Sequence, residues 1–558
     1  IGENRILNDS ISENEILGNR VRLFRLGQEV PVYVSTENLF EQNDFIEFYG
    51  IKNDGSIDRQ LYLVPEFQPN FFESLYADTV SYFLTMDDFP EKKRIINVQN
   101  DLSGNLPVKE AYYYHVSKLY KISTKFSPGE NPNQLLNYVF DSEYDVGEGF
   151  VGDNFVGPNQ NRPYYLPSYN KYTLQPELKT KLRGCVLFSN NSTTHSLAIT
   201  VTNTGIDTLY STRAGIKNFE YEIPLDYVVN NTTVRFYPLV DKSRCGVFWL
   251  ELTYPRQYNF NNSSSVEFAV HKTSEAYVEV IGYNNKSTDA IIYDRKNNQR
   301  FIGKRENNIT KIFFPQTDFP KDSLFISSQD TSDLYEIKSL TEAKFVDPIL
   351  ANYIIISQKD LLSSTEGVNY VNEFANYRSS IEGGSFEVAT YMIDELENTF
   401  SYGIKGHPIA IRNAVNFLID NETVKPELLF IIGKGFGYHN GRNSSNNFIQ
   451  SYGEPASDNL LVSRSPQISY PQIGVGRLSA RTSDDIRVYL EKEKLYEDVQ
   501  KTGSIDDQTL ERKEWMKSIL HLGGGNFLDK QKTFARYLEN YRKIIEGPSF
   551  GAKVHSLY

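Results

Sequence analysis

The chain has 558 residues, too many for one hydrophobic core, and this length sets an expectation of roughly three to four domains. Hydrophobic residues make up 39% and charged residues 23%, which are ordinary proportions for a globular protein, and no apolar run approaches the ~18 residues of a membrane helix. The net charge of −13 offers no basic stripe to a phosphate backbone and therefore argues against a nucleic-acid partner.

The first part of the chain, up to about residue 345, has the pattern of β-structure. Tyr and Phe supply nearly all of an aromatic share of 13%, and these residues suit half-buried strands. Residues 44–64 alternate on both sides of Asp54-Gly55, and residues 290–303 do so around Asn297-Asn298, so each segment predicts a β-hairpin. Short alternating runs between them predict β-sandwich modules. An internal boundary is expected near residue 125, where the sequence becomes rich in Pro, Gly and Asn.

The two cysteines, Cys185 and Cys245, both fall in this β-rich part. In an exported protein they would form one disulfide, which on the chain-entropy argument adds roughly 4 kcal/mol. As free thiols they would act as small buried hydrophobic residues, and the sequence leaves both possibilities open. Asn191-Ser192-Thr193 fits a glycosylation sequon, but turn chemistry in an Asn-rich protein explains it better.

After residue 345 the pattern changes to alternating strands and helices. Continuous apolar runs predict strands, and segments with apolar residues at helical spacing predict the helices between them. This order is typical of a mostly parallel α/β sheet, whose site lies outside the carboxyl ends of the strands. The predicted strands are residues 352–357, 386–393, 427–433, 472–477, 517–525 and 553–558, and the predicted helices are residues 367–378, 407–420, 481–499 and 533–547.

A Gly-rich loop follows the third predicted strand and contains Gly433, Lys434 and Gly435. A phosphate-binding Walker loop needs Gly-Lys-Ser/Thr four residues after its first Gly, and here the Lys comes one place after that Gly. The glycines therefore let the backbone turn sharply off the sheet. His439 lies on the same loop, where catalysis is expected, although a loop histidine is commonly only solvated.

Other familiar catalytic patterns are missing from the sequence. The seven histidines include no His-x-x-x-His pair, which argues against a zinc site. No Gly-x-Ser-x-Gly motif occurs, which argues against an α/β-hydrolase. Nothing in the sequence brings a cysteine together with a histidine.

The order of segments in the α/β part resembles the gingipain-type cysteine peptidases, whose catalytic domain is a caspase-like α/β sheet. The most specific of these segments is PQIGVGRLSARTSDDI, which resembles the family's Gly-Arg-Leu/Phe-Ser segment. The others are ANYIIISQKD, ELENTFSYGIKGHPIAIRN, PELLFIIGKG and GEPASDNLL. In the β-rich part, VRLFRLGQEVPVYV, NDFIEFYG, SLYADTVSYFLTM, SEYDVGEGFVG and LELTYPRQYNF resemble the N-terminal modules of PorU-like sortases of the type IX secretion system.

These patterns predict a multidomain chain with an N-terminal β domain at 1–125, a β-sandwich domain at 126–345 and an incomplete caspase-like domain at 346–558. The resemblance implies that a thiolate attacks a peptide carbonyl, with a histidine as base and backbone N–H groups holding the oxyanion. It places that histidine roughly 30 residues beyond Tyr558 and the cysteine roughly 30 further, so no catalytic residue is expected within residues 1–558 and the chain is interpreted as a fragment.

Four residues are the candidates for substrate binding or for the rim of the site: Gly433, Lys434, His439 and Asp458. Lys434 stands where the family often has Asp, which implies either altered substrate tolerance or an inactive member. Asp458 keeps the family's Ser-Asp pattern, which implies a role in loop ordering, metal contact or substrate recognition. The alternative is that Asp458 is only the carboxylate of an Asx turn in a loop. Arg477 is expected to be no more than an ion-pair partner.

The implied function is that of a cysteine peptidase or transpeptidase that processes the C-terminal signals of exported cargo proteins at the outer membrane and cell surface. Its implied partners are these cargo proteins and a PorV-like outer-membrane β-barrel of the secretion system. No cofactor is implied, and a structural calcium ion is left open. The alternative is a non-catalytic pseudo-peptidase that serves as cargo, adhesin or scaffold of the same machinery.

Overall fold

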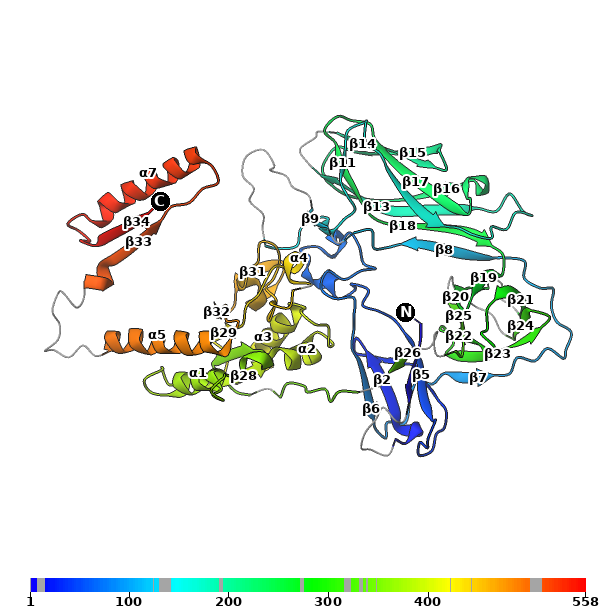
Figure 1. Cartoon of the computed structure of the whole chain (residues 1–558), viewed down its shortest axis with the longest axis horizontal. Helices are drawn as coiled ribbons and strands as arrows, with labels where there is room; N and C mark the ends of the chain where they lie inside the picture. The colour runs from blue at the N-terminus through cyan, green and yellow to red at the C-terminus, as the bar shows by residue number, and fades with distance from the viewer. Residues whose placement is uncertain are drawn as a thin grey trace. The chain divides into compact units, whose positions relative to one another are not determined.

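The computed structural model divides the chain into two compact units, Ile1–Ser483 and Asp484–Tyr558, and Figure 1 colours them along the sequence. None of the helices described is both long and apolar enough to cross a membrane. The sequon at residues 191–193 lies outside the described residues. The structure describes residues 2–558 without 8–15, 124, 130–141, 190–193, 271–274, 316–322, 331–334, 338–339, 348, 422, 443 and 502–513.

The first unit begins with two small sheets around one apolar core, with strand orders β26-β1-β5-β4 and β3-β2-β6. Val21 and Leu23 alternate into this core from one sheet, and Ile46 and Phe48 enter it from the other. The strands are β1 (Gly2–Leu7), β2 (Val21–Arg25), β3 (Gln28–Val30), β4 (Tyr33–Val34), β5 (Phe45–Gly50), β6 (Tyr82–Met86) and β26 (Tyr335–Ile337).

The hairpin predicted for residues 44–64 is wrong in its second arm. Strand β5 covers the first arm, but after Gly55 the chain enters a short 3-10 helix, η3 (Asp58–Leu61). The reason is a tertiary contact, because the Asp58 carboxylate is fully buried and accepts hydrogen bonds from Ser74 Oγ and Leu75 N. A segment anchored in this way does not return along β5.

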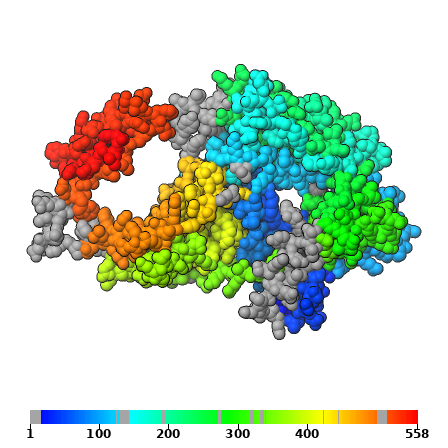
Figure 2. Space-filling model, viewed as in Figure 1, coloured from blue at the N-terminus to red at the C-terminus, as the bar shows by residue number. Residues whose placement is uncertain are grey.

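A β-sandwich follows, with one sheet in the order β11-β18-β13-β16, where β8 also pairs with β18, and a second in the order β12-β17-β14-β15. Val234 and Phe236 on β17 alternate into the core between the sheets. The space-filling view shows one continuous body here (cyan to green in Figure 2). The strands are β8 (Tyr113–Leu119), β11 (Phe155–Val156), β12 (Arg162–Pro167), β13 (Thr180–Ser189), β14 (His195–Val201), β15 (Thr204–Ser211), β16 (Gly215–Ile223), β17 (Asn231–Pro238) and β18 (Arg244–Arg256).

An eight-stranded sheet follows, with the strand order β19-β21-β24-β23-β22-β25-β20 and with β7 beside β23. Its buried residues form a separate hydrophobic core. The hairpin predicted for residues 290–303 is confirmed, since β22 and β23 pair antiparallel and Asn298 takes a left-handed conformation at the turn, with φ of 54°. The strands are β7 (Ile96–Val98), β19 (Asn259–Ser263), β20 (Ser265–Phe268), β21 (Ala276–Tyr283), β22 (Ala290–Asp294), β23 (Gln299–Glu306), β24 (Ile309–Phe314) and β25 (Leu324–Ser328).

Strand pairing links the first two predicted ranges, 1–125 and 126–345. Strand β7 pairs with β23, β8 pairs with β18, and β1 pairs with β26. Each of these pairs joins a strand before residue 125 to a strand well after it. The division of the chain into independent domains at 1–125, 126–345 and 346–558 therefore stays a prediction.

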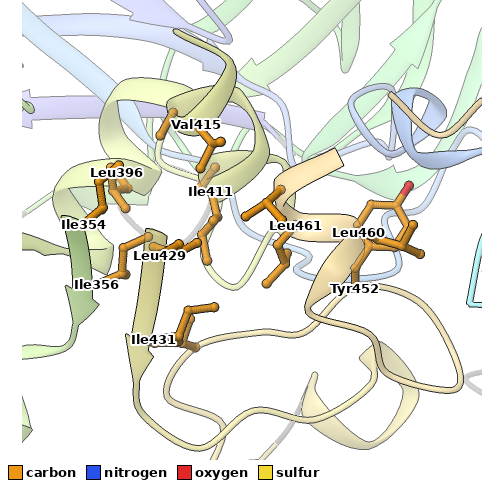
Figure 3. Packing of buried hydrophobic residues seen from close by; sticks show 14 of the residues in the cluster. Ile354, Ile356, Leu396, Ile411, Val415, Leu429, Ile431, Tyr452, Leu460 and Leu461 are labelled. Atoms are coloured by element: carbon orange, nitrogen blue, oxygen red, sulfur yellow. The ribbon is translucent and has the colours of Figure 1, made fainter. Parts of the chain in front are cut away.

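The α/β part of the first unit is a four-stranded parallel sheet in the order β28-β27-β29-β32. Leu429 and Ile431 lie on one face of β29 and pack with Ile411 and Val415 of helix α3 (Figure 3). Phe430 faces the other way and stacks on Phe374 of helix α1 at 4.9 Å between ring centroids. The sheet is therefore covered on both faces, which the continuous apolar strands predict. The elements are β27 (Tyr353–Ser357), α1 (Tyr370–Ser379), β28 (Val388–Met392), α2 (Ile393–Phe400), α3 (Ile409–Asn421), β29 (Leu428–Ile432) and β32 (Gly474–Leu478).

The last two predicted strands form a sheet of their own in the second unit. There β33 and β34 pair in parallel around the crossover helix α7. All six predicted α/β strands are present, and among the described residues they form sheets of four and two strands. The elements of this unit are α5 (Ser483–Lys501), β33 (Ser518–Leu522), α7 (Leu528–Ile545) and β34 (Lys553–Leu557).

Candidate functional site

The candidate site lies where β29 and β32 end, and the backbone there is held from both sides. Strands β29 and β32 run parallel, with Ile431 opposite Arg477, so the loops that follow them start from one edge of the sheet. Gly433 N donates to Leu478 O at 2.9 Å, and Lys434 N donates to Ala480 O at 3.0 Å. The Gly-rich loop is therefore a continuation of the sheet edge.

Arg477 ties three segments of this edge together. Its Nε and Nη2 donate to Asp458 Oδ2 and Oδ1 at 2.6 and 2.8 Å, which is a bidentate ion pair. Its Nη1 donates to Gly433 O at 2.8 Å and to Ile449 O at 2.9 Å. The Arg477 side chain is only 9% exposed. The sequence predicts an ion pair for Arg477. It does not predict the two carbonyl contacts, because Ile449 and Gly433 are 28 and 44 positions away from Arg477 in the chain.

Two residues fit closely around this guanidinium. The Asp458 carboxylate also accepts a hydrogen bond from Ser451 Oγ at 3.0 Å, so Asp458 orders the segment that carries it instead of forming a local Asx turn. Gly435 lies so close that a Cβ there would come within 2.4 Å of Ile449 O and 2.9 Å of Arg477 Nη1. Only glycine fits at this close approach.

His439 lies on the short helix α4 (Tyr438–Gly441), directly after the Gly-rich loop. Its Nδ1 is 2.8 Å from Glu454 Oε2, and its ring stacks on Phe126 with centroids 4.6 Å apart. Phe126 belongs to β9 (Phe126–Pro128) of the β-rich part. The imidazole is therefore held between a carboxylate and an aromatic ring.

Lys434 is the remaining predicted rim residue. Its Nζ lies 4.7 Å from the centroid of the Phe436 ring, and no carboxylate among the residues described is within ion-pair distance of it. Gly433 and Asp458 thus meet at Arg477, Lys434 follows Gly433 on the Gly-rich loop, and His439 lies on helix α4 directly after that loop. These positions are structural facts, and their roles in binding stay a prediction.

Neither cysteine belongs to this site. Cys185 and Cys245 are free, fully buried thiols on strands β13 and β18 of the sandwich, so no disulfide forms between them here. Burial raises the pKa of Cys245 to about 12 and raises that of Cys185 as well, which keeps both protonated and unreactive. Within the described ranges, no three His, Cys, Asp or Glu side chains cluster as metal ligands, and a structural calcium ion stays a prediction.

A buried cluster of tyrosines behind the loop escaped sequence reasoning. Tyr438 on α4 stacks on Tyr144 with centroids 5.5 Å apart, and Tyr62 and Tyr76 lie in the same core. Glu148 on β10 (Glu148–Phe150) is 3% exposed among them, and burial raises its pKa well above its usual range. The residues come from three distant segments, 62–76, 144–148 and helix α4, so only the tertiary structure brings them together.

Glu148 gives the protein a specific pH dependence. Because its pKa is raised in the folded state, the folded protein keeps a proton that the unfolded chain releases above about pH 4.5. Between that pH and the folded pKa, each pH unit lowers the free energy of unfolding by about 1.4 kcal/mol. Glu148→Gln stays neutral throughout, so we expect it to be more stable than the wild type at neutral pH and equally stable below about pH 4.

Urea unfolding of both proteins at a series of pH values between 4 and 8 measures this difference. Glu91→Gln, which removes an exposed carboxylate, is the matched control and is unfolded at the same pH values. Parallel pH profiles for the wild type and Glu148→Gln would show that Glu148 is ionised in the folded protein.

A second buried contact joins the β-rich and α/β parts. His407, just before helix α3, places Nε2 3.1 Å from Asp58 Oδ1, and neither side chain is exposed to solvent. Nearby, Arg412 on α3 donates to Gln60 O at 2.9 Å. The 3-10 helix η3 is therefore anchored to the amino end of α3.

Comparison with known proteins connects this fold to a peptidase family. The family model described as Peptidase family C25 matches residues 348–558, the region that contains the parallel sheet and its loops. No curated protein matches the chain in sequence.

Among solved structures, dimeric latent PorU from Porphyromonas gingivalis matches with a TM-score of 0.56 at 13% identity, over 96% of this chain and 54% of that one. The chain thus spans about half the length of that protein. The CBM36-1 domain of a multidomain xylanase from the hindgut metagenome of Trinervitermes trinervoides matches with a TM-score of 0.15 at 13% identity, over 25% of this chain and 95% of that one. A β-glucuronidase of Bacteroides uniformis matches with a TM-score of 0.16 at 12% identity, over 43% and 26% of the two chains.

The last two scores are too low to indicate a shared fold. The resemblance to the gingipain-type peptidases and the expected fold class are confirmed by the first match and by the family model. Residues 348–558 therefore match the model of peptidase family C25, within a chain whose fold is similar to that of about half of PorU.

Proposed function

We propose that the full-length protein is a PorU-like cysteine peptidase or sortase that processes the C-terminal signals of exported cargo proteins in a type IX secretion system. The observation that carries the proposal is that the peptidase family model covers the parallel sheet and the loops at its carboxyl edge. We further propose a location at the outer membrane and cell surface, with cargo proteins and a PorV-like outer-membrane β-barrel as partners.

In this proposal the nucleophilic cysteine and its histidine belong to the part of the protein that follows Tyr558. The thiolate attacks the substrate carbonyl, the C–N bond breaks, and the leaving amine takes its proton from the imidazolium. Water in a peptidase, or a second amine in a sortase, then attacks the thioester carbonyl, so that the acyl group is transferred and the C–S bond breaks to release the cysteine thiolate. Cys185 and Cys245 cannot take this role, because both thiols are buried away from solvent.

The residues of this chain support the reaction by fixing the loops at the edge of the sheet. Arg477 and Asp458 hold the Gly-rich loop to the neighbouring segment, with the contacts described above. Peptidase chemistry depends on such rigid positioning, since small displacements of a bound substrate lower the rate strongly.

The test uses the full-length protein, a thiol-reactive fluorescent probe and a cargo protein that carries its C-terminal signal. We expect rapid labelling of one cysteine after residue 558, release of the signal from the cargo, and loss of both on changing that cysteine to alanine. The double variant Cys185→Ala and Cys245→Ala is the control and should keep both properties.

Labelling only after unfolding, with the cargo left intact, would overturn the peptidase proposal. That result would favour the non-catalytic alternative, in which the protein serves as cargo, adhesin or scaffold. Lys434 is the observation that keeps this alternative in view, because gingipain-type peptidases often have Asp at this position.

A further inference from the structure

Several charged side chains at the carboxyl edge of the sheet have a partner of opposite charge among the residues that the structure describes. Arg477 binds Asp458, and Arg442 binds Asp78. The His439 ring lies beside Glu454. Lys434 has no carboxylate partner among the residues that the structure describes, and its ammonium contacts the face of the Phe436 ring instead.

Hydrogen bonds hold the backbone of Lys434 in place at this edge. Lys434 N donates to Ala480 O at 3.0 Å, and Lys434 O accepts from Phe448 N at 2.9 Å and from Ile449 N at 3.1 Å. Phe436 is fixed as well, because its N donates to Asn447 Oδ1 at 3.2 Å. An ammonium on an aromatic face in a partly buried loop still has N–H donors that an anion can accept.

We propose that Lys434 binds a carboxylate of the peptide substrate, and this inference rests on the proposed function of the same site. The carboxylate is either the side chain of an Asp or Glu close to the scissile bond or the free carboxyl terminus of the cleaved signal. An ammonium and a carboxylate attract strongly at a partly desolvated surface, and the arginine and histidine nearby already have acidic neighbours. Lys434, in contrast, has no carboxylate partner among the described residues and is available to an acidic substrate.

Binding is measured by fluorescence anisotropy on the full-length protein, with labelled peptides that carry the C-terminal signal of a cargo protein. The peptides differ in two ways, with Asp and Glu kept or changed to Asn and Gln, and with a free or an amidated carboxyl terminus. We expect Lys434→Gln to weaken binding of the acidic peptides about tenfold and Lys434→Glu to weaken it further. The neutral peptides should bind both variants and the wild type alike.

The two arms identify the source of the carboxylate. If amidation alone abolishes the effect of Lys434→Gln, the terminal carboxylate is the ligand, and if side-chain neutralisation does so, the acidic side chain is the ligand. The matched control is Lys425→Gln, at the opposite end of the same strand, where Lys425 is exposed and precedes Leu428. This variant should bind every peptide as the wild type does.

Equal effects of Lys434→Gln on acidic and neutral peptides would overturn the inference, as would failure of any peptide to bind the wild type. Cleavage of the cargo is scored separately in the same preparations. A protein that binds acidic peptides through Lys434 without cleaving them would refute the peptidase proposal and leave the binding site standing. Cleavage of the cargo by a protein that binds acidic and neutral peptides equally would support the peptidase proposal and refute carboxylate binding by Lys434.

Discussion

Replacing Arg477 with alanine should destabilise the α/β part of the protein by about 3 kcal/mol, the largest effect expected from any change at the candidate site. The substitution leaves the Asp458 carboxylate without its bidentate partner and leaves two backbone carbonyls, of Gly433 and Ile449, without their donor. A buried acceptor without a donor costs about 1–3 kcal/mol, and here several are left at once.

Urea unfolding and hydrogen–deuterium exchange of residues 433–458 measure this change. Arg477→Lys keeps the charge but loses the paired geometry, so it should fall between alanine and wild type. Arg464→Ala is the matched control, because the exposed pair of Arg464 with Asp420 should contribute less than about 1 kcal/mol. Equal stability of Arg477→Ala and Arg464→Ala would show that the Arg477 contacts do not hold the loop.

Asp58→Ala is the second substitution with a large expected effect, a loss of at least about 3 kcal/mol. Three groups lose their acceptor in a fully buried position: Ser74 Oγ, Leu75 N and His407 Nε2. Since Asp58 comes from the β-rich part and His407 from the α/β part, we also expect the two parts to respond together. Exchange should increase both in residues 58–76 and at the start of α3.

The effect of Asp58→Ala is measured by urea unfolding, together with proteolysis under native conditions. Asp54→Ala is the control, because Asp54 lies four residues earlier on the same segment with an exposed side chain and should change stability by less than about 1 kcal/mol. A destabilised Asp58→Ala protein with normal exchange at α3 would contradict the proposed anchoring.

Local patterns predict the elements of the α/β part well. The strand at 353–357 is an uninterrupted apolar run, and α3 shows its apolar face at helical spacing, so period and composition are sufficient for both. The turn between β22 and β23 is equally local, because Asn298 takes the left-handed conformation that asparagine tolerates. The local residue pattern is therefore sufficient to predict these elements.

Long-range contacts explain what the sequence does not reveal. Residues 44–64 alternate like a hairpin, yet the burial of Asp58 against His407, a residue 349 positions away, redirects the second arm. The place of the Gly-rich loop at the end of β29 is predictable, whereas the fourfold contact of Arg477 is not, because its partners are spread over three loops. Glu148 and its tyrosines are missed for the same reason.

The pairing of β1 with β26 has a consequence for biosynthesis. Asn4 on β1 lies beside Tyr335 on β26, so at roughly 10 residues per second the ribosome supplies this neighbour about half a minute after β1 itself. Until then one edge of β1 has no partner strand, and an N-terminal fragment made alone would expose that edge to pairing with other chains. The module that contains β1 is therefore completed only after β26 has been made, and termination of translation between β1 and β26 should yield aggregation-prone products.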